Sequence, residues 1–137
     1  MAISYTSLIG LNTSNPLKVS ERVQAGFSYA ALERLQRAVD VPLAQMAALV
    51  HIPARTLARR KASGRLDPDE SDRLLRMSRV IATALALFEG DYPAARRWLS
   101  LPLPALGGQS PLELAGTDVG AREVERLAGQ LERGVLV

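Results

Sequence analysis

The sequence contains no cysteine and a single histidine, His51. Without cysteine the chain can form no disulfide, no thiolate metal site and no cysteine nucleophile. A zinc site or a Ser/His/Asp triad would have to be built around His51 alone, and the sequence offers it no evident partner. We therefore expect no metal, no other cofactor and no enzymatic activity.

Long apolar runs are also absent. No stretch reaches the roughly 18 apolar residues of a membrane-spanning helix. The first residues, MAISYTSLIG, lack the basic start and long apolar stretch of a signal peptide. The sequence thus predicts a cytoplasmic protein with no membrane partner.

Strand signals are missing, whereas helical spacing closed by good caps recurs along the chain, which predicts an all-α fold. Residues 1–27 are rich in turn-forming residues and are expected to form a loose arm with a short helix near 19–25. A hinge or domain boundary is expected at Glu89–Gly90. The other expected helices span residues 28–41, 43–49, 53–63, 67–89, 91–99 and 119–133, with a capping box at Ser110–Glu113.

Charge is unevenly distributed along the 137 residues. Residues 1–66 contain nine basic and three acidic residues, against eight and eleven in residues 67–137. This asymmetry predicts that a polyanion contacts the first half and a different partner the second. Fifteen of the 17 basic residues are Arg, which suits bidentate contacts with phosphate or guanine, although a GC-rich genome would give the same bias.

The spacing of small and apolar residues in 43–61 is typical of a helix-turn-helix. Ala47 is placed where the two helices cross, while Ile52 and Leu57 follow the turn at apolar positions. His51 occupies the turn position where glycine is usual, because that position often needs a positive φ.

The second helix of this pair has a strongly basic face. Arg59, Arg60 and Lys61 have no acidic residue within four positions, so they either bind an external anion or face water. The predicted major-groove contacts are Arg55, Thr56 and Arg59, and the predicted phosphate contacts are Arg60, Lys61 and Arg65. The alternative is an amphipathic helix whose solvated face happens to be basic.

The next helix carries two acid and arginine pairs spaced four apart, Asp69 with Arg73 and Asp72 with Arg76. Such spacing predicts ion pairs that each stabilise the helix by a few tenths of a kcal/mol. The helix also has more apolar residues than one small bundle obviously needs. We therefore expect it to contribute to a homodimer, which would double the DNA contacts on a palindromic operator.

A family resemblance spans nearly the whole chain. The runs RTLARRKASGRL, ESDRLLRMSRV and ALALFEGDYPAARRWLSLPLPALGGQSPLELAGTDVGAREVERLAGQLERGVLV closely resemble the Xre-type antitoxins of RES–Xre toxin–antitoxin pairs. The combination of WL, P, LGG, SP-E-L, G-x-x-V and a late G is shared by the antitoxins called Xre, MbcA and ParS.

This resemblance implies two functional regions after the arm. Residues 28–90 would form an Xre-like helix-turn-helix bundle that binds and represses the operon's own promoter. Residues 91–137 would form a small helical domain that binds a RES-domain toxin, an NAD-degrading enzyme. A free-standing helix-turn-helix regulator without a toxin partner is the alternative.

The implied toxin contacts lie near the C-terminus. They are Trp98, Arg133, Val135, Leu136 and Val137. From its sequence context alone Trp98 is a core anchor. The apolar residues after Gly134 are either a frayed or back-packed tail, or a plug that enters the toxin's active-site cleft.

Overall fold

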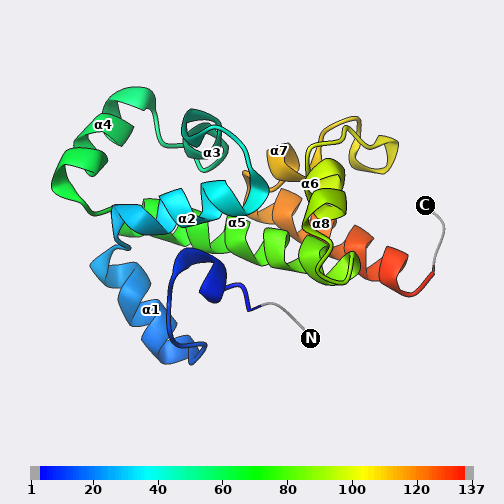
Figure 1. The fold of residues 1–137 in the computed structure, drawn as a ribbon, viewed down its shortest axis with the longest axis horizontal. Helices are drawn as coiled ribbons and strands as arrows, with labels where there is room; N and C mark the ends of the chain where they lie inside the picture. The colour runs from blue at the N-terminus through cyan, green and yellow to red at the C-terminus, as the bar shows by residue number, and fades with distance from the viewer. Residues whose placement is uncertain (1–3, 135–137) are drawn as a thin grey trace.

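The computed structural model describes residues 4–134, which form eight α-helices and two 3-10 turns without any strand (Figure 1). The helices are α1 (Pro16–Ala25), α2 (Tyr29–Val39), α3 (Leu43–Leu49), α4 (Ala54–Ser63), α5 (Pro68–Leu87), α6 (Tyr92–Leu99), α7 (Pro111–Leu114) and α8 (Asp118–Glu132), and the 3-10 turns are η1 (Ser7–Ile9) and η2 (Pro104–Leu106). None of these helices is long and apolar enough to cross a membrane. The predicted all-α class is confirmed.

The helix boundaries follow the capping residues seen in the sequence. Asp67 precedes α5, and the backbone N of Asp67 donates a hydrogen bond to the Glu70 carboxylate at 2.8 Å. Asp91 accepts from Ala94 N at the start of α6, and Ser110 with Glu113 forms the capping box of α7. These side chains satisfy backbone N–H groups that have no partner inside the helix, so each fixes where its helix begins.

The long helix α5 lies at the centre of the fold. It packs against η1, α1, α2, α6 and α8, with α1 near its start and α6 near its end (Figure 1). Its apolar side chains are buried within the chain: Leu74, Met77, Val80, Ile81, Ala84 and Leu85. The surplus of apolar residues on this helix serves neighbours in the same chain and gives no support to the predicted dimer interface, which stays a prediction.

The N-terminal region is packed rather than loose. Leu8 and Ile9 of η1 and Val19 of α1 are buried, and α1 lies against α5. The turn-forming residues that suggested an arm, such as Gly10 and Asn15, connect these packed pieces; Asn15 caps α1 by accepting from Leu17 N at 3.0 Å. For residues 4–27 the expectation of a loose arm is wrong.

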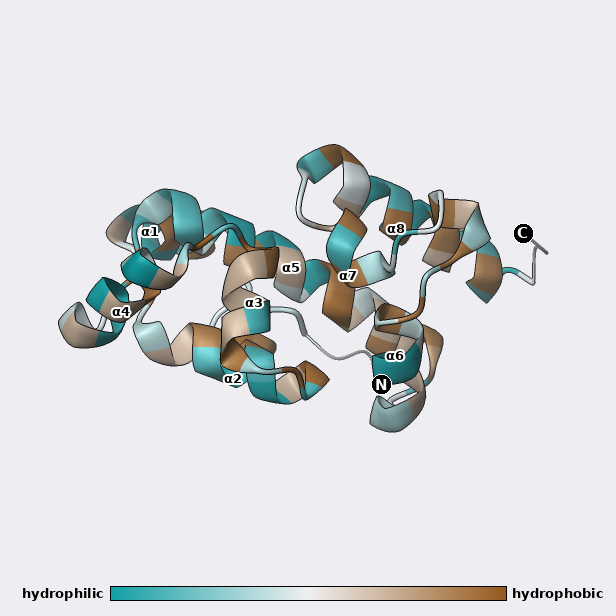
Figure 2. Ribbon diagram, turned by 90° about the horizontal axis from the view of Figure 1, so that it is seen from above, coloured by the Kyte–Doolittle hydropathy of each residue, from teal (hydrophilic) through white to brown (hydrophobic). Residues whose placement is uncertain are grey.

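The predicted hinge is a sharp turn within a continuous core. Glu89 and Gly90 both have positive φ, 54° and 83°, where the chain reverses between α5 and α6. The buried cluster continues across this turn into α6, α7 and α8, and Arg96 of α6 donates to Ala38 O at the C-terminal end of α2 at 3.2 Å. Hydrophobic and hydrophilic residues are mixed along α8 (Figure 2), and its buried residues recur every three to four positions, so they lie on one face.

Candidate functional site

The turn between α3 and α4 has the geometry expected of a helix-turn-helix. Ile52 N donates to Ala47 O at 2.8 Å and His51 N to Ala48 O at 3.1 Å, and His51 has a positive φ of 59°. These bonds and the left-handed residue end α3 in a Schellman-type arrangement. Ala47 and Ile52 are buried and Leu57 is half-buried, so the predicted packing of the two helices is confirmed.

The positive φ at His51 leads to a prediction about this turn. His51→Gly relieves the steric strain but gives the unfolded chain more freedom, so the free energy of unfolding should stay within about 1 kcal/mol of the natural protein. His51→Val places a β-branched residue in the left-handed region and should destabilise by about 1–3 kcal/mol. Urea unfolding of both variants checks this, and a Val variant as stable as the Gly variant would contradict it.

Helix α4 projects from the body of the molecule at the end opposite to the end of α8 (Figures 1 and 2). No residue of α4 is fully buried. Arg55, Arg59 and Lys61 are exposed and make no ion pair within residues 4–134, and Arg59 Nη2 donates to the Thr56 hydroxyl at 3.4 Å. Arg55 and Arg59 are one turn apart, so they face the same way, as two contacts in one groove require.

Arg60 differs from its neighbours because it is engaged inside the protein. Its Nη2 lies 2.7 Å from Asp67 Oδ2 and its Nε 2.8 Å from Glu70 Oε1, and its side chain is 19% exposed. The inference that Arg60 needs an external anion or faces water is wrong, because acidic residues reach it across the turn between α4 and α5.

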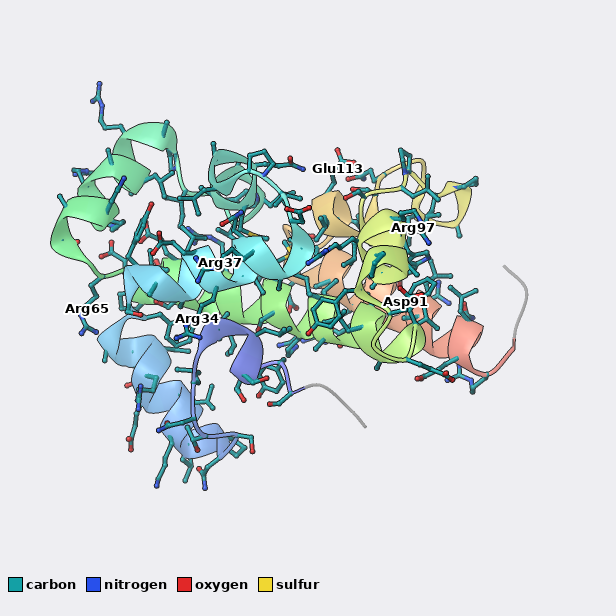
Figure 3. The ribbon with its side chains drawn as sticks, viewed as in Figure 1. Arg34, Arg37, Arg65, Asp91, Arg97 and Glu113 are labelled. Carbon is teal, nitrogen blue, oxygen red and sulfur yellow. The ribbon has the colours of Figure 1, made fainter. Side chains whose placement is uncertain are left out.

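Arg65 also has partners within the fold. Its Nη1 donates to Gly26 O at 2.7 Å and to Ala25 O at 3.4 Å, at the C-terminal end of α1. In Figure 3 it lies at the edge of the molecule, where the loop between α4 and α5 approaches α1. Arginine is favourable there because the last carbonyls of a helix carry partial negative charge.

The Glu70 carboxylate is buried, and its pKa predicts how stability depends on pH. Burial by itself raises the pKa of Glu70, but hydrogen bonds from Arg60 and Asp67 N outweigh burial and lower it below its ordinary value of 4.5. A carboxylate with a lowered pKa contributes stability that is present above its unfolded-state pKa and is lost as pH falls through the folded-state pKa.

We therefore expect the free energy of unfolding to fall between about pH 5 and pH 3, and to fall less steeply in Glu70→Gln. Glu113 and Glu123, whose pKa values are lowered by hydrogen bonds from Ser110 and Arg126, titrate in both proteins. The difference between the two curves therefore isolates Glu70. Parallel curves from urea unfolding across this range would contradict the prediction.

The two ion pairs predicted on α5 do not form. Arg73 Nε instead donates to Val50 O at 2.7 Å, and within residues 4–134 neither Asp69 nor Asp72 forms a salt bridge. Exposed ion pairs contribute little, whereas an unsatisfied carbonyl at the end of a helix costs more. Arg73 thereby holds the turn of the helix-turn-helix against α5.

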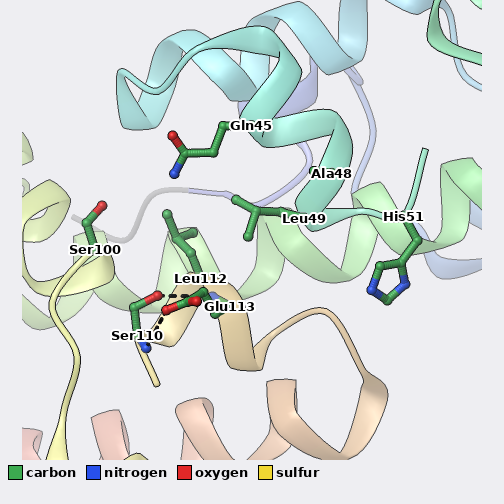
Figure 4. Close-up of a pocket in the computed structure, with 8 residues that line it drawn as sticks. All are labelled: Gln45, Ala48, Leu49, His51, Ser100, Ser110, Leu112 and Glu113. Carbon is green, nitrogen blue, oxygen red and sulfur yellow. Dashed lines mark hydrogen bonds between the residues drawn. The ribbon is translucent and has the colours of Figure 1, made fainter. Parts of the chain in front are cut away.

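The helix-turn-helix meets the C-terminal helices at a hollow of about 420 Å³. Gln45 and Leu49 of α3 face Leu112 and Glu113 of α7 across it (Figure 4). Beside the hollow the two halves are in contact, because a Cβ added at Gly116 would lie 3.2 Å from His51 Nε2. The two predicted domains thus share both α5 and a direct contact.

A second hollow, of about 490 Å³, opens beside α6, η2 and α8 and is mostly apolar; we call it the α6–α8 groove. Its lining residues are Trp98, Leu103, Pro104, Ala105, Leu127 and Leu131. Trp98 is half-buried, with its ring centroid 6.2 Å from that of Phe88. It therefore anchors the core on one side and is open to a partner on the other.

Comparison with known proteins identifies the family. Residues 18–79 match the antitoxin Xre-like helix-turn-helix domain, and residues 83–134 match the antitoxin Xre/MbcA/ParS C-terminal toxin-binding domain. Antitoxin Xre of Yersinia enterocolitica is 38% identical over 128 residues, covering 93% of this chain and 86% of the relative. The chain belongs to the Xre antitoxin family.

Two other antitoxins are similar over most of their length. Antitoxin Xre of Pseudomonas putida is 33% identical over 123 residues, covering 88% of this chain and 75% of the relative. The Prs ADP-ribosylating antitoxin of a Sphingobium species is 26% identical over 121 residues, covering 82% and 76%. The resemblance seen in the sequence is confirmed at the level of the family.

The family assignment relates the two surfaces of the antitoxin to two matched regions. Helix α4 lies in the helix-turn-helix match, and the α6–α8 groove with Trp98 lies in the toxin-binding match. Arg133 is exposed just after α8. Val135, Leu136 and Val137 lie outside the described residues and outside both matches, so their predicted contact with a toxin stays a prediction.

Proposed function

We propose that this antitoxin neutralises a RES-domain toxin that degrades NAD, and that it represses its own operon by binding operator DNA. The observation that carries the proposal is the placement of two unlike surfaces at opposite ends of one rigid helical body. Exposed cations of α4 form one surface and the α6–α8 groove the other. Because they are far apart, operator and toxin can bind without competing for the same residues.

For the DNA surface, α4 is the recognition helix. Arg55, Thr56 and Arg59 face the major groove, where the guanidinium groups bind base edges, and Lys61 contacts phosphate. Two-fold pairing of the chain would place two recognition helices on a palindromic operator, so the antitoxin is a homodimer. Light scattering at micromolar concentration should give twice the 14.8 kDa chain mass.

For the toxin surface, the antitoxin acts by occupying the toxin's cleft. The α6–α8 groove receives apolar side chains of the toxin around Trp98. Arg133, just after α8, lies at the edge of the same interface. A cleft that binds NAD must hold apolar rings and a pyrophosphate, so it offers an apolar pocket and cationic groups. The apolar tripeptide Val135, Leu136 and Val137 complements the apolar pocket.

One relative suggests a second chemistry for the toxin. The Sphingobium antitoxin is named for ADP-ribosylation of Prs, which makes transfer of ADP-ribose to a protein the alternative to NAD degradation. Both reactions consume NAD, so a plug in the NAD site would stop either. Mass spectrometry of total protein from intoxicated cells distinguishes them, because only the transferase leaves ADP-ribose on a protein.

The proposal is tested by copurification with the product of the neighbouring gene. A tagged antitoxin should retain a RES-domain protein through gel filtration, and cells expressing that protein alone should lose NAD. The complex should protect NAD and still bind the promoter fragment. Failure to bind the neighbouring protein, with promoter binding intact, would instead support the free-standing regulator.

A further inference from the structure

The recognition helix α4 is held to the body by few contacts, and this raises the question of what fixes its direction. At its start it is held by the turn after α3, where Ile52 is buried. At its end, two backbone hydrogen bonds hold the loop after α4 to the segment before and at the start of α2. Leu66 N donates to Phe27 O at 2.8 Å, and Tyr29 N donates to Gly64 O at 2.9 Å. Between these ends α4 has no fully buried side chain.

Two contacts hold the middle of α4: half-buried Leu57 packs against the core, and Arg60 forms an ion pair with Glu70. Glu70 is 6% exposed, and its Oε1 accepts from Arg60 Nε at 2.8 Å while its Oε2 accepts from Arg60 Nη2 at 3.3 Å. The same Oε1 accepts from the backbone N of Asp67, the residue that caps the start of α5. A two-point guanidinium–carboxylate contact fixes direction as well as distance, so it joins the inner face of α4 to the rigid start of α5.

We propose that the Arg60–Glu70 pair sets the orientation of α4 in the major groove, which makes Arg60 a positioning residue and not a phosphate contact. The inference rests on the proposed DNA binding. Base contacts by Arg55 and Arg59 depend on where α4 points, whereas attraction to phosphates depends mainly on charge. Loss of the pair should therefore reduce operator affinity more than affinity for unrelated DNA.

Glu70→Gln distinguishes a positioning role of Arg60 from a phosphate-binding role, because the two roles predict opposite changes in operator affinity. If the pair positions α4, the variant should bind its operator about tenfold more weakly, with affinity for unrelated DNA little changed. If Arg60 instead binds phosphate, the substitution leaves its guanidinium paired only with Asp67 and removes a negative charge, so operator binding should be unchanged or tighter. The second result would overturn the proposal.

Two further variants complete the binding experiment. Asp72→Asn makes the same change of charge at an exposed position of α5 that has no ion pair in the described part of the chain, and its operator affinity should not fall. Arg60→Gln combined with Glu70→Gln should bind operator no more weakly than Arg60→Gln alone, because the Arg60–Glu70 pair is already lost in that single variant. Losses that add in the double variant would overturn the proposal.

A measurement without DNA keeps the test independent of the proposed function. Amide hydrogen exchange in residues 54–63 should be faster in Glu70→Gln than in the natural protein, with exchange in the buried middle of α5 unchanged. If the natural protein fails to bind its promoter, DNA binding is refuted, and the exchange result still decides whether the pair holds α4. Unchanged exchange in α4 would refute the positioning role.

Discussion

The double substitution Arg55→Ala and Arg59→Ala is expected to abolish operator binding while leaving toxin neutralisation intact. Both side chains are exposed on one face of α4 and lack ion-pair partners in the described part of the chain. A bidentate arginine–guanine contact contributes about 1–3 kcal/mol, so losing two should weaken binding about a hundredfold or more. Titration of a labelled promoter fragment at fixed salt measures this loss.

Folding and neutralisation should survive the substitution for two structural reasons. Alanine has the highest helix propensity, and neither arginine supports the core, so the free energy of unfolding should change little. The α6–α8 groove lies at the opposite end of the molecule. Normal growth of cells that carry the variant with the toxin is the corresponding readout.

A matched control separates position from net charge. Arg122→Ala with Arg126→Ala removes the same two charges from exposed positions of α8, one turn apart. This variant should retain operator binding. An equal loss of operator affinity in the control would mean that overall charge drives binding. Unchanged operator affinity in the Arg55 and Arg59 variant would place the DNA surface elsewhere.

Local features of the fold were predictable because their causes are local. A capping residue and the helix it starts are adjacent in sequence, so Asp67 and Ser110 mark the starts of α5 and α7 directly. The helix-turn-helix is also local: the spacing of Ala47, His51 and Ile52 fixes the turn, and the bond from Ile52 N to Ala47 O closes it.

The contacts that position the site were not predictable, because they join residues distant in sequence. Arg73 reaches Val50 across 23 positions and Arg96 reaches Ala38 across 58. Each depends on how α5 and α6 dock onto the helix-turn-helix, which the helical periodicity of either segment does not reveal. The spacing of residues on α5 predicts an acidic partner for Arg73. Its actual partner, the carbonyl of Val50, comes within reach only when α5 docks against the helix-turn-helix.

The N-terminal region illustrates the same difficulty. Turn-forming residues are spread through residues 1–27, so its composition suggests a loose arm. Two adjacent apolar residues, Leu8 and Ile9, suffice to pack η1 against α2 and α5. Whether such a short apolar pair is buried depends on a surface that the rest of the chain provides.

Removal of residues 135–137 is expected to abolish protection from the toxin while leaving the antitoxin folded and able to bind its operator. The buried core extends through α8, which ends at Glu132, so the fold does not depend on the last three residues. Burial of three apolar side chains contributes about 1.5–3 kcal/mol each. Affinity for the toxin should fall at least about a hundredfold.

The truncated protein should be compared with Trp98→Ala, because the two variants remove different parts of the proposed interface. Loss of the tripeptide should leave a weakened complex in which the toxin still consumes NAD, since the groove continues to bind while the cleft is open. Loss of the indole should weaken the complex itself, because the groove loses its largest apolar surface. If cells with the truncated antitoxin keep both their NAD and normal growth, the body of the C-terminal domain blocks the cleft and the tripeptide does not.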